Sequence, residues 1–445
     1  MLWGLTMNQI DKIRVLDSNE SDFDDKFRQI STSEMAVNES VDNIVDEIIR
    51  AVRDDGDDAL LKYTNRFDGR NCRKVSDLLV SYDNLEKAKM KVDQNVFEAL
   101  KLAAKRIQAY HQRQVQESWQ YREEDGNLLG QKITAIERVG VYVPGGKASY
   151  PSSVLMNVIP ARIAGVDEIV MVVPAPNGEI NPSVLAAAEL VGVDEVWTIG
   201  GAQAVAGLAY GTQSLRRVDK IVGPGNIYVA SAKRKVFGKV GLDMVAGPSE
   251  IMIICDGETN PDWIAMDLFS QAEHDENAQA VLLSWDEAFV KQVHASIKKL
   301  LPDMERKEII EKSFFNRGAL IKVRDSDEAV ELCNQMAPEH LELSVSEPEA
   351  LLLQIRHAGS IFLGRHSAEA LGDYCAGPNH VLPTSATARF SSPLGVYDFQ
   401  KRSSVISCTS KGATFLGRVA STLARSESLE AHARSAEYRI EDKCY

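Results

Sequence analysis

The chain has 445 residues, of which 44% are hydrophobic and 26% charged, an ordinary composition for a globular protein of about two or three domains. A formal net charge of −14 without a long run of Lys or Arg excludes nucleic acid and anionic membranes as main partners. The six cysteines are scattered and form no Cys-x-x-Cys pair, so we expect a cytoplasmic location and neither a disulfide framework nor a thiolate zinc site.

The first part of the chain, about 115 residues, is predicted to be mostly helical. Its start lacks the apolar core and basic flank of a signal peptide, and Met7 is an alternative initiator. Apolar residues recur at helical spacing over 43–63, and the segment Asp54-Asp55-Gly56 is expected to break that helix. No run in the chain approaches the length of a membrane span.

From Val139 onward the pattern changes to strands that end in Gly/Pro turns and are followed by helices. Strands that alternate with helices predict a parallel sheet with helices on its faces. The expected strands are 140–143, 168–173, 195–199 and 220–222.

Two glycine turns in this region, 200–203 and 223–226, are expected to place backbone N–H groups at helix N-termini. Such ends bind phosphate, which would suit a dinucleotide. Neither turn is a Gly-x-Gly-x-x-Gly fingerprint, and none occurs elsewhere in the chain. The alternative is that these glycines only supply positive φ for ordinary turns.

A second series of strands and helices follows, with strands expected at 250–254, 278–283, 319–323 and 360–363. The last 45 or so residues return to a helical pattern with a Ser-rich break near 421–428. The predicted fold class is therefore α/β, with two Rossmann-like parallel-sheet domains that lack the glycine fingerprint and with helical N- and C-terminal extensions.

A helix is predicted over 262–269, with Asn260 as its N-cap and Pro261 at its first position. At its end Gln271 and His274 are three residues apart, so their side chains share one face. An amide oxygen and an imidazole nitrogen held in this way are half of a metal site. The alternative is a polar helix end that hydrogen-bonds locally.

Three other histidines stand in unusual local sequence. Glu339 and His340 are neighbours after Pro338, which allows an irregular backbone and thus a shared cleft for an acid/base pair; the alternative is a polar surface loop. Asp373 and His380 lie in a Gly/Pro-rich loop over 372–383, where Asp373 is either a hard oxygen ligand or a turn former.

His432 lies in the C-terminal helical region, where a lone histidine is usually a surface residue. Gln271, His274, Asp373 and a further histidine would make a ligand set of nitrogen and oxygen atoms. Such a set suits Zn²⁺, with Mn²⁺ or Co²⁺ as substitutes. The spacing alone does not show that these residues meet.

Seven ordered motifs carry a family resemblance. They are the segments 139–146, 200–204, 223–226, 246–250, 270–274, 337–341 and 376–383. With them the chain resembles the histidinol dehydrogenases from about Asp24 to Tyr438. One departure stands in the C-terminal motif, where Ser428-Leu429 replaces the usual Gly-Leu.

The resemblance implies a role for each matching position. Zinc ligands fall on Gln271, His274, Asp373 and His432, and the acid/base pair falls on Glu339 and His340. Substrate contacts fall on Ser249, His380 and Glu427, beside the metal ligands and His340. NAD contacts fall on Tyr142, Gln203 and Asn226.

The resemblance also implies an architecture and a reaction. It indicates an N-terminal extension over 1–25, a metal- and substrate-binding domain over 26–138 plus 247–385, an NAD-binding domain over 139–246 and a C-terminal arm over 386–445. The arm would be exchanged in a homodimer, so that His432 completes the other subunit's site. The reaction would take L-histidinol to L-histidine through bound L-histidinaldehyde, with reduction of two NAD⁺ and one Zn²⁺ per subunit.

Two other enzymes are compatible with the same residues. A family paralogue that oxidises another polar alcohol would share the zinc and NAD motifs, although the presence of Ser249, His380 and Glu427 favours histidinol. A zinc hydrolase would need only a zinc-activated water and Glu339, but it leaves the repeated strand, turn and helix units unexplained.

Overall fold

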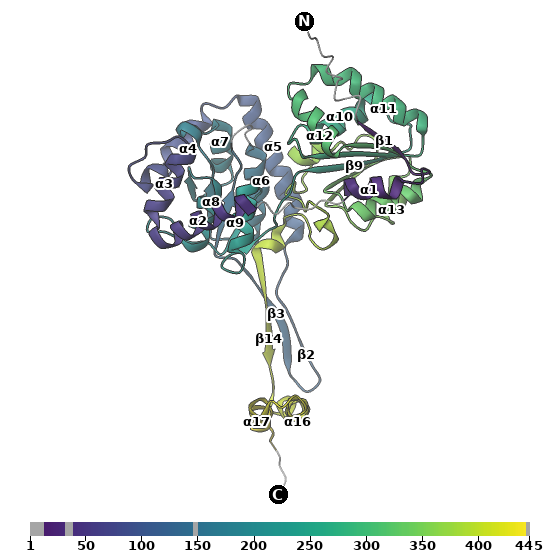
Figure 1. Ribbon diagram of the computed structural model, residues 1–445. Coiled ribbons are helices and arrows are strands. Elements are labelled where there is room, and N and C mark those ends of the chain that lie inside the picture. Colours follow the sequence, from purple (N-terminus) through teal and green to yellow (C-terminus); the bar gives the residue numbers. More distant parts are fainter. Residues whose placement is uncertain (1–12, 32–38, 146–149, 442–445) are drawn as a thin grey trace.

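The computed structural model describes residues 13–31, 39–145 and 150–441. Two α/β bodies lie side by side, and a long antiparallel ribbon carries two helices away from them (Figure 1). Each body is built on a parallel sheet, which confirms the predicted fold class. Residues 1–12 of the expected N-terminal extension, together with Gly146, lie outside the described residues.

The first body, here called the five-stranded body, has the strand order β6-β5-β4-β7-β8 with every pair parallel. Its central strands are continuous apolar runs because helices cover both faces. Its strands are β4 (Arg138–Tyr142), β5 (Glu168–Val172), β6 (Glu195–Trp197), β7 (Lys220–Val222) and β8 (Gly241–Leu242). The connecting helices are α6 (Pro151–Ala164), α7 (Pro182–Leu190), α8 (Gly201–Tyr210) and α9 (Ile227–Val236).

The N-terminal helices also belong to this body, which corrects the predicted domain boundary. Val45, Leu60 and Val205 share one buried core, and Leu100 and Ile107 share a second core on the other face of the sheet. Residues 39–111 were expected to join 247–385, but their apolar faces pack against the five-stranded sheet. These helices are α2 (Glu39–Asp55), α3 (Asp57–Phe67), α4 (Tyr82–Lys89) and α5 (Gln94–His111). Gly56, at φ +57, separates α2 from α3 as predicted.

The second body, here called the six-stranded body, has the order β1-β11-β10-β9-β12-β13, also parallel throughout. Its edge strand β1 comes from the segment expected to be an extension, because Arg14–Asp17 pairs with Ala319–Lys322. The strands are β1 (Arg14–Asp17), β9 (Glu250–Cys255), β10 (Gln279–Ser284), β11 (Ala319–Lys322), β12 (His340–Ser344) and β13 (Ser360–Leu363).

Helices cover both faces of this sheet as well. In α10 the predicted cap and buried face are confirmed, since the Asn260 side chain accepts from the Asp262 N–H and Ile264, Leu268 and Ala272 are buried. The helices are α1 (Phe23–Ser31), α10 (Pro261–Ala272), α11 (Glu287–Leu300), α12 (Lys307–Arg317), α13 (Ser326–Met336), α14 (Pro348–Leu352) and α15 (Glu369–Tyr374).

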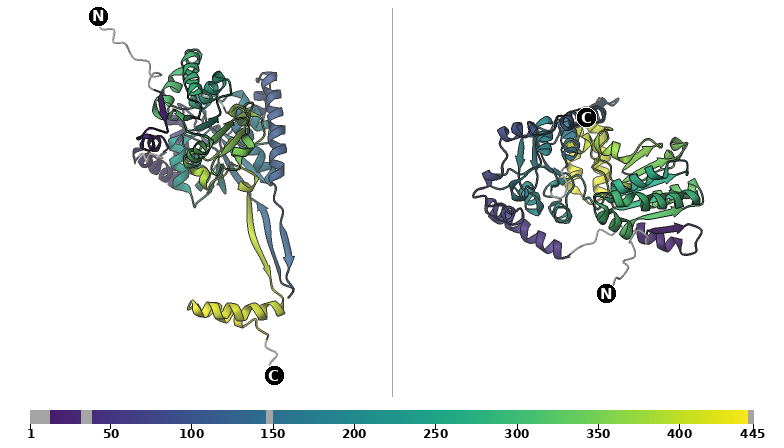
Figure 2. Two further views of the ribbon diagram at one scale, coloured as in Figure 1. Left: turned by 90° about the vertical axis from the view of Figure 1, so that its right-hand side faces the viewer. Right: turned by 90° about the horizontal axis from the view of Figure 1, so that it is seen from above.

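A three-stranded antiparallel ribbon, here called the stalk, projects from the bodies (Figures 1 and 2). It consists of β2 (Trp119–Arg122), β3 (Leu128–Ala135) and β14 (Gln400–Ser407). The strand β14 was not expected, because the C-terminal region was predicted to be helical. The stalk carries two terminal helices at its far end, α16 (Ser410–Ser426) and α17 (Glu430–Glu437). Among the described helices none is long and apolar enough to cross a membrane.

The turn between α16 and α17 contains Ser428, the residue that stands where the resemblance leads us to expect glycine. Ser428 has φ +62, a left-handed conformation that glycine adopts without strain. We expect Ser428→Gly to raise the free energy of unfolding by about 0.5–1 kcal/mol. Urea unfolding monitored by circular dichroism measures this change. Thr422→Gly, inside α16, is the control and is expected to lower stability. A lower stability of Ser428→Gly would contradict the strain argument.

Candidate active site

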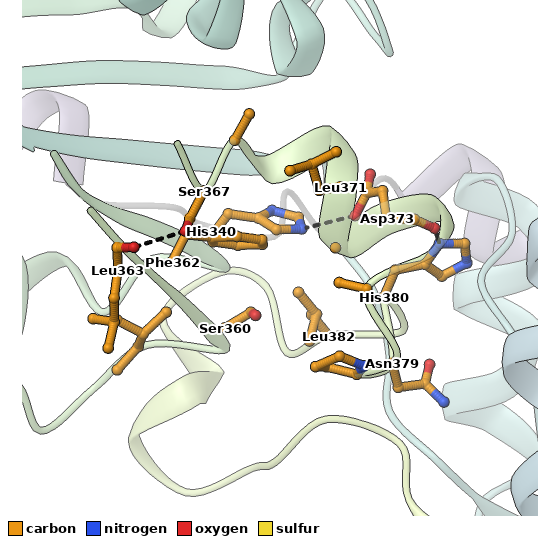
Figure 3. Close-up of a pocket in the computed structure, with 15 residues that line it drawn as sticks. His340, Ser360, Phe362, Leu363, Ser367, Leu371, Asp373, Asn379, His380 and Leu382 are labelled. Atoms are coloured by element: carbon orange, nitrogen blue, oxygen red, sulfur yellow. Dashed lines mark hydrogen bonds and ion pairs between the residues drawn. The ribbon is translucent and has the colours of Figure 1, made fainter. Parts of the chain in front are cut away.

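The largest feature of the site is a pocket of about 240 Å³ at the amino ends of β12 and β13 (Figure 3). Its lining includes His340, Asp373 and His380, together with Phe362 and Ser360. In the five-stranded body the glycine turns lie at the opposite, carboxyl ends of the strands. The lining residues of the pocket lie between 340 and 382, and the five-stranded body contacts this lining through the Ser153 hydroxyl, which bonds to His380.

His340 is the centre of the site. It begins β12 and is 3% exposed. Its Nδ1 lies 3.0 Å from the Glu250 carbonyl oxygen, so a proton on Nδ1 donates there. Its Nε2 points toward Asp373, 3.5 Å from Oδ1, and lies 3.7 Å from Glu369 Oε1 (Figure 3). This arrangement leaves Nε2 as the atom that faces the pocket and exchanges a proton.

The charges around His340 favour its protonated form in the free protein. Burial alone lowers the pKa of this imidazole, but the carboxylates of Glu369, Glu339 and Asp373 outweigh burial and raise the pKa well above 6.5. Positive charge bound at Asp373 would neutralise one of these carboxylates. A bound cation therefore shifts His340 toward the neutral base.

Glu339 is buried next to His340, with its Oε2 accepting from the Glu250 N–H at 3.0 Å. This oxygen is 3.7 Å from His340 Nδ1. Burial raises the pKa of Glu339 to about 8, although the charge of His340 opposes that shift. A carboxyl group with this pKa exchanges protons near neutral pH, which suits an acid/base role.

Of the predicted metal ligands Asp373 lines the pocket, and Gln271 and His274 lie near His340 behind it. Gln271 is fully buried, and its Nε2 lies 2.7 Å from His340 Nδ1 and donates to Glu369 Oε1 at 2.9 Å. His274 follows the end of α10, and its side chain is exposed in the single chain. Partial removal from water lowers the pKa of His274, the charge of Asp373 raises it, and the charge of His340 lowers it. Asp373, on α15, completes this group.

The donor atoms of the site fit a metal ion of the zinc type. In the part of the chain that the structure describes, the buried atoms Gln271 Oε1 and His340 Nε2 have no hydrogen-bond partner. His340, Glu369 and Asp373 each offer one ligand atom, and these atoms lie within 4.8 Å of one another. The free Oε1 of Gln271 and the carboxylate of Asp373 suit a Zn²⁺ ion. Of the clustered ligand atoms only that of Asp373 belongs to the predicted ligand set, because His340 was predicted as a base and Glu369 was not predicted.

If Gln271 holds the metal, then Gln271→Leu should remove it. We expect zinc affinity to fall by at least about 100-fold, because leucine replaces the buried amide ligand with apolar methyl groups. Dialysis followed by metal analysis measures the zinc that remains. Gln279→Leu is the matched control, since Gln279 is 2% exposed in the same body and bonds to the Ile30 carbonyl instead. Full zinc content in Gln271→Leu would rule out this ligand.

His380 joins the two bodies at the pocket. Its Nδ1 donates to the Asp373 carbonyl oxygen at 2.8 Å, which leaves Nε2 to accept from the Ser153 hydroxyl at 3.3 Å. Ser153 lies on α6 of the five-stranded body. Burial lowers the pKa of His380, so the imidazole is neutral at pH 7. Ser249 immediately precedes β9, and its carbonyl oxygen accepts from the Gln279 N–H.

The predicted residues of the arm are not at this pocket in the single chain. Glu427 and His432 lie on the exposed terminal helices at the far end of the stalk (Figure 1). Either these residues have no part in the site, or they reach the pocket of another chain.

The predicted NAD contacts lie together at the carboxyl edge of the five-stranded sheet. The Tyr142 hydroxyl accepts from the Gly201 N–H at 3.0 Å. Burial raises the pKa of the Tyr142 hydroxyl to about 12. Gln203 is 1% exposed, and its Oε1 has no partner among the described residues. Asn226 is exposed and caps α9. Side chains thus already occupy both helix N-termini that were considered for phosphate.

Sequence reasoning missed two buried acids of the site. Glu369 contacts both Gln271 and His340, and Glu250 provides the carbonyl oxygen that accepts from His340 Nδ1. A signal for Glu369 existed, since Glu369 and Asp373 are four residues apart and so share a helix face. No local pattern marks Glu250, whose role depends on the pairing of β9 with β12.

The comparisons with known proteins decide the family. The family model described as histidinol dehydrogenase matches residues 31–440. The chain belongs to the histidinol dehydrogenase family. The predicted resemblance is thereby confirmed over nearly the whole chain, and with it the class of oxidoreductases.

Individual members of the histidinol dehydrogenase family are similar to the chain from end to end. The histidinol dehydrogenase of Pseudomonas fluorescens Pf-5 is 64% identical over 430 residues, covering 97% of each chain. That of Pseudomonas aeruginosa is 62% identical and covers 97% of this chain and 98% of its own. A crystal structure of histidinol dehydrogenase from Elizabethkingia anophelis superposes with a TM-score of 0.91 at 32% identity, covering 96% and 98% of the two chains.

Proposed function

We propose that the protein catalyses the zinc-dependent, NAD-dependent oxidation of L-histidinol to L-histidine through bound L-histidinaldehyde, the last steps of histidine biosynthesis in the cytoplasm. The observation that carries the proposal is the cluster of Gln271, His340 and Asp373, in which His340 and Asp373 line the pocket and Gln271 contacts His340. The buried atoms Gln271 Oε1 and His340 Nε2 have no hydrogen-bond partner among the described residues. Family membership supplies the substrate.

Two groups from outside the chain complete the chemistry. Bound zinc supplies a fixed positive charge that holds the substrate's imidazole and amino nitrogens, and NAD⁺ accepts the hydride in each oxidation. In this proposal Gln271, His274 and Asp373 hold the metal together with His432 of a second chain. Tyr142, Gln203 and Asn226 contact the NAD⁺ at the facing edge of the five-stranded sheet.

His340 removes the proton of the alcohol in the first oxidation. Its Nε2 faces the pocket while its Nδ1 is held by the Glu250 carbonyl oxygen, so one nitrogen is fixed and the other is free to accept a proton. The substrate contacts His380, Ser249 and a second chain's Glu427 position the alcohol carbon. Positioning of this kind converts a collision between three molecules into a step within one complex.

Glu339 acts in the second oxidation. Water must add to the aldehyde before the second hydride can leave, and the Glu339 carboxylate takes the proton of that water. The hydrate then loses a hydride and a proton to give the acid. The aldehyde stays bound between the two steps, which keeps it from side reactions in solvent.

The stalk supports a homodimer in which active sites are shared. Glu427 and His432 are far from the pocket of their own chain, and the terminal helices expose Phe415, Leu423 and Tyr438 to solvent. Exposed apolar side chains of this size are typical of a surface that another chain covers. We therefore propose that each arm docks on the partner and completes the partner's site.

Counting the NADH formed per histidinol tests the whole proposal. We expect two molecules of NADH per histidinol consumed, with loss of both oxidations after chelation and recovery on addition of Zn²⁺. Ultraviolet absorbance of NADH, combined with chromatography of histidinol and histidine, measures the ratio. A ratio of one would contradict the two-step reaction. Activity only with a different polar alcohol would identify a paralogue, and hydrolysis without NAD⁺ would identify a zinc hydrolase.

A further inference from the structure

A fully buried ion pair lies beneath the glycine turn 223–226 of the five-stranded body. The Nζ of Lys233 donates to Asp243 Oδ1 at 2.5 Å, and the two side chains are 2% and 1% exposed. Lys233 lies on α9, and Asp243 directly follows β8. Burying both charges carries a large desolvation cost, so stability alone does not explain the pair: apolar residues of the same size often serve as well.

The pair holds both backbone polar groups of Gly223. Lys233 Nζ donates to the Gly223 carbonyl oxygen at 2.9 Å, while the Gly223 N–H donates to Asp243 Oδ2 at 2.8 Å. Gly223 has φ +100, and a Cβ at this position would lie 2.1 Å from the Tyr142 carbonyl oxygen. The turn is therefore pressed against β4 on one side and held by two charges on the other.

The two residues also connect the two halves of the active site. Gly223 begins the turn that ends at Asn226, the predicted NAD contact. Asp243 begins the segment 243–249, which leaves the five-stranded body and ends at Ser249, the predicted substrate contact. Both members of the pair bond to the first of these segments, through Gly223, whereas Ser249 lies at the far end of the second.

We propose that Lys233 and Asp243 are positioning residues that hold the 223–226 turn in its cofactor-binding shape before NAD⁺ arrives. The inference rests on the proposed function, because it assigns NAD⁺ to Asn226. Its physical basis is preorganisation: a turn that is already fixed loses little conformational entropy on binding. Removal of either charge frees Gly223 and weakens NAD⁺ binding without touching the substrate pocket.

The same sheet offers a matched control. Arg138, 6% exposed, pairs with Glu195 at 2.9 Å and with Glu168 at the amino edge, the end opposite Gly223. Arg138→Met therefore removes a buried charge of the same body, one whose carboxylate partners are partly exposed, and leaves the glycine turn intact. It separates a loss of stability from a loss of turn geometry.

The experiment compares Asp243→Asn, Lys233→Met/Asp243→Asn and Arg138→Met with the wild-type dimer, in NADH formation with histidinol. For both Asp243 variants we expect the KM for NAD⁺ to rise about tenfold while the KM for histidinol changes less than about twofold. For Arg138→Met we expect a lower melting temperature and a KM for NAD⁺ within about twofold of wild type. Equal changes in both KM values, or an equal effect of Arg138→Met, would overturn the inference.

Hydrogen exchange on the wild-type protein tests the same point without a variant. If the turn is held in advance, the Gly223 N–H exchanges slowly both without and with NAD⁺. Fast exchange that becomes slow only with NAD⁺ would overturn the inference, including the case in which the variants do not fold. A wild-type protein that forms no NADH from histidinol would instead refute the proposed function.

Discussion

Replacing Glu339 with glutamine is expected to slow aldehyde oxidation by about 100-fold or more and alcohol oxidation by less than about tenfold. The amide keeps the shape of the side chain and cannot take a proton from water. In the alcohol step His340 is the base, so Glu339 affects that step only through its charge. Single-turnover measurements that start from histidinol and from supplied histidinaldehyde measure the two rates separately.

Glu342→Gln is the matched control for this experiment. Glu342 is 4% exposed on β12, the strand that begins directly after Glu339, and its Oε1 accepts from the Glu369 N–H. This variant removes a buried carboxyl of the same size, so any general effect of lost charge should slow both oxidations equally. An equal loss of both steps in Glu339→Gln would show that Glu339 is not the base for water.

The pKa of Glu339 predicts how the aldehyde step depends on pH. Burial raises this pKa to about 8, and a base acts only after losing its proton. The wild-type rate of aldehyde oxidation should therefore increase as pH rises through about 8, where the carboxylate form becomes dominant. Glu339→Gln should lack this increase. The same profile in both proteins would assign the ionisation to another group.

Much of the fold was predictable from periodicity. The strands near 168–173, 220–222 and 360–363 formed within a residue of expectation, because buried parallel strands are short apolar runs bounded by turn residues. The stalk was not predictable. Its strand β14 has few buried side chains, and its pairing with β3, far away in sequence, gives no local pattern.

The grouping of elements into bodies was wrong for a related reason. Helices α2 to α5 precede the five-stranded sheet in sequence, and local pattern does not show which sheet a helix will cover. The deciding contacts join Val45 and Leu60 to Val205, positions separated by well over a hundred residues. Likewise β1, which comes from the N-terminal part of the chain, pairs with β11 and forms one edge of the six-stranded sheet.

The site was predictable in its residues and not in its geometry. Local sequence pointed to Gln271, His340 and Asp373, whereas their contacts with one another depend on the pairing of β12 with β9 and on the packing of α10 and α15. Pro338 was expected to allow Glu339 and His340 to face one cleft. Both side chains are buried near Glu250, with a carboxyl to imidazole distance of 3.7 Å, but only His340 belongs to the lining of the pocket.

The position of the C-terminal arm determines which chains can contribute residues to the proposed metal site. His432 is one of four predicted ligands, yet it lies beyond the stalk, away from the pocket of its own chain (Figure 1). If His432 holds the metal as proposed, a complete site needs the body of one chain and the arm of another. In such a dimer the two sites depend on each other's chains, which symmetric exchange of an element produces at low cost.

Mixing two inactive variants should consequently restore activity. His432→Ala damages the arm, Glu339→Gln/His340→Ala damages the body, and each homodimer should retain less than about 1% of wild-type turnover. In a heterodimer with exchanged arms, the intact body of the first chain meets the intact arm of the second and forms one wild-type site. Random exchange at equal amounts should yield about a quarter of the wild-type rate. Two different affinity tags on the chains verify that subunits have exchanged. Heterodimers purified in this way that remain inactive would show that each site is built from one chain.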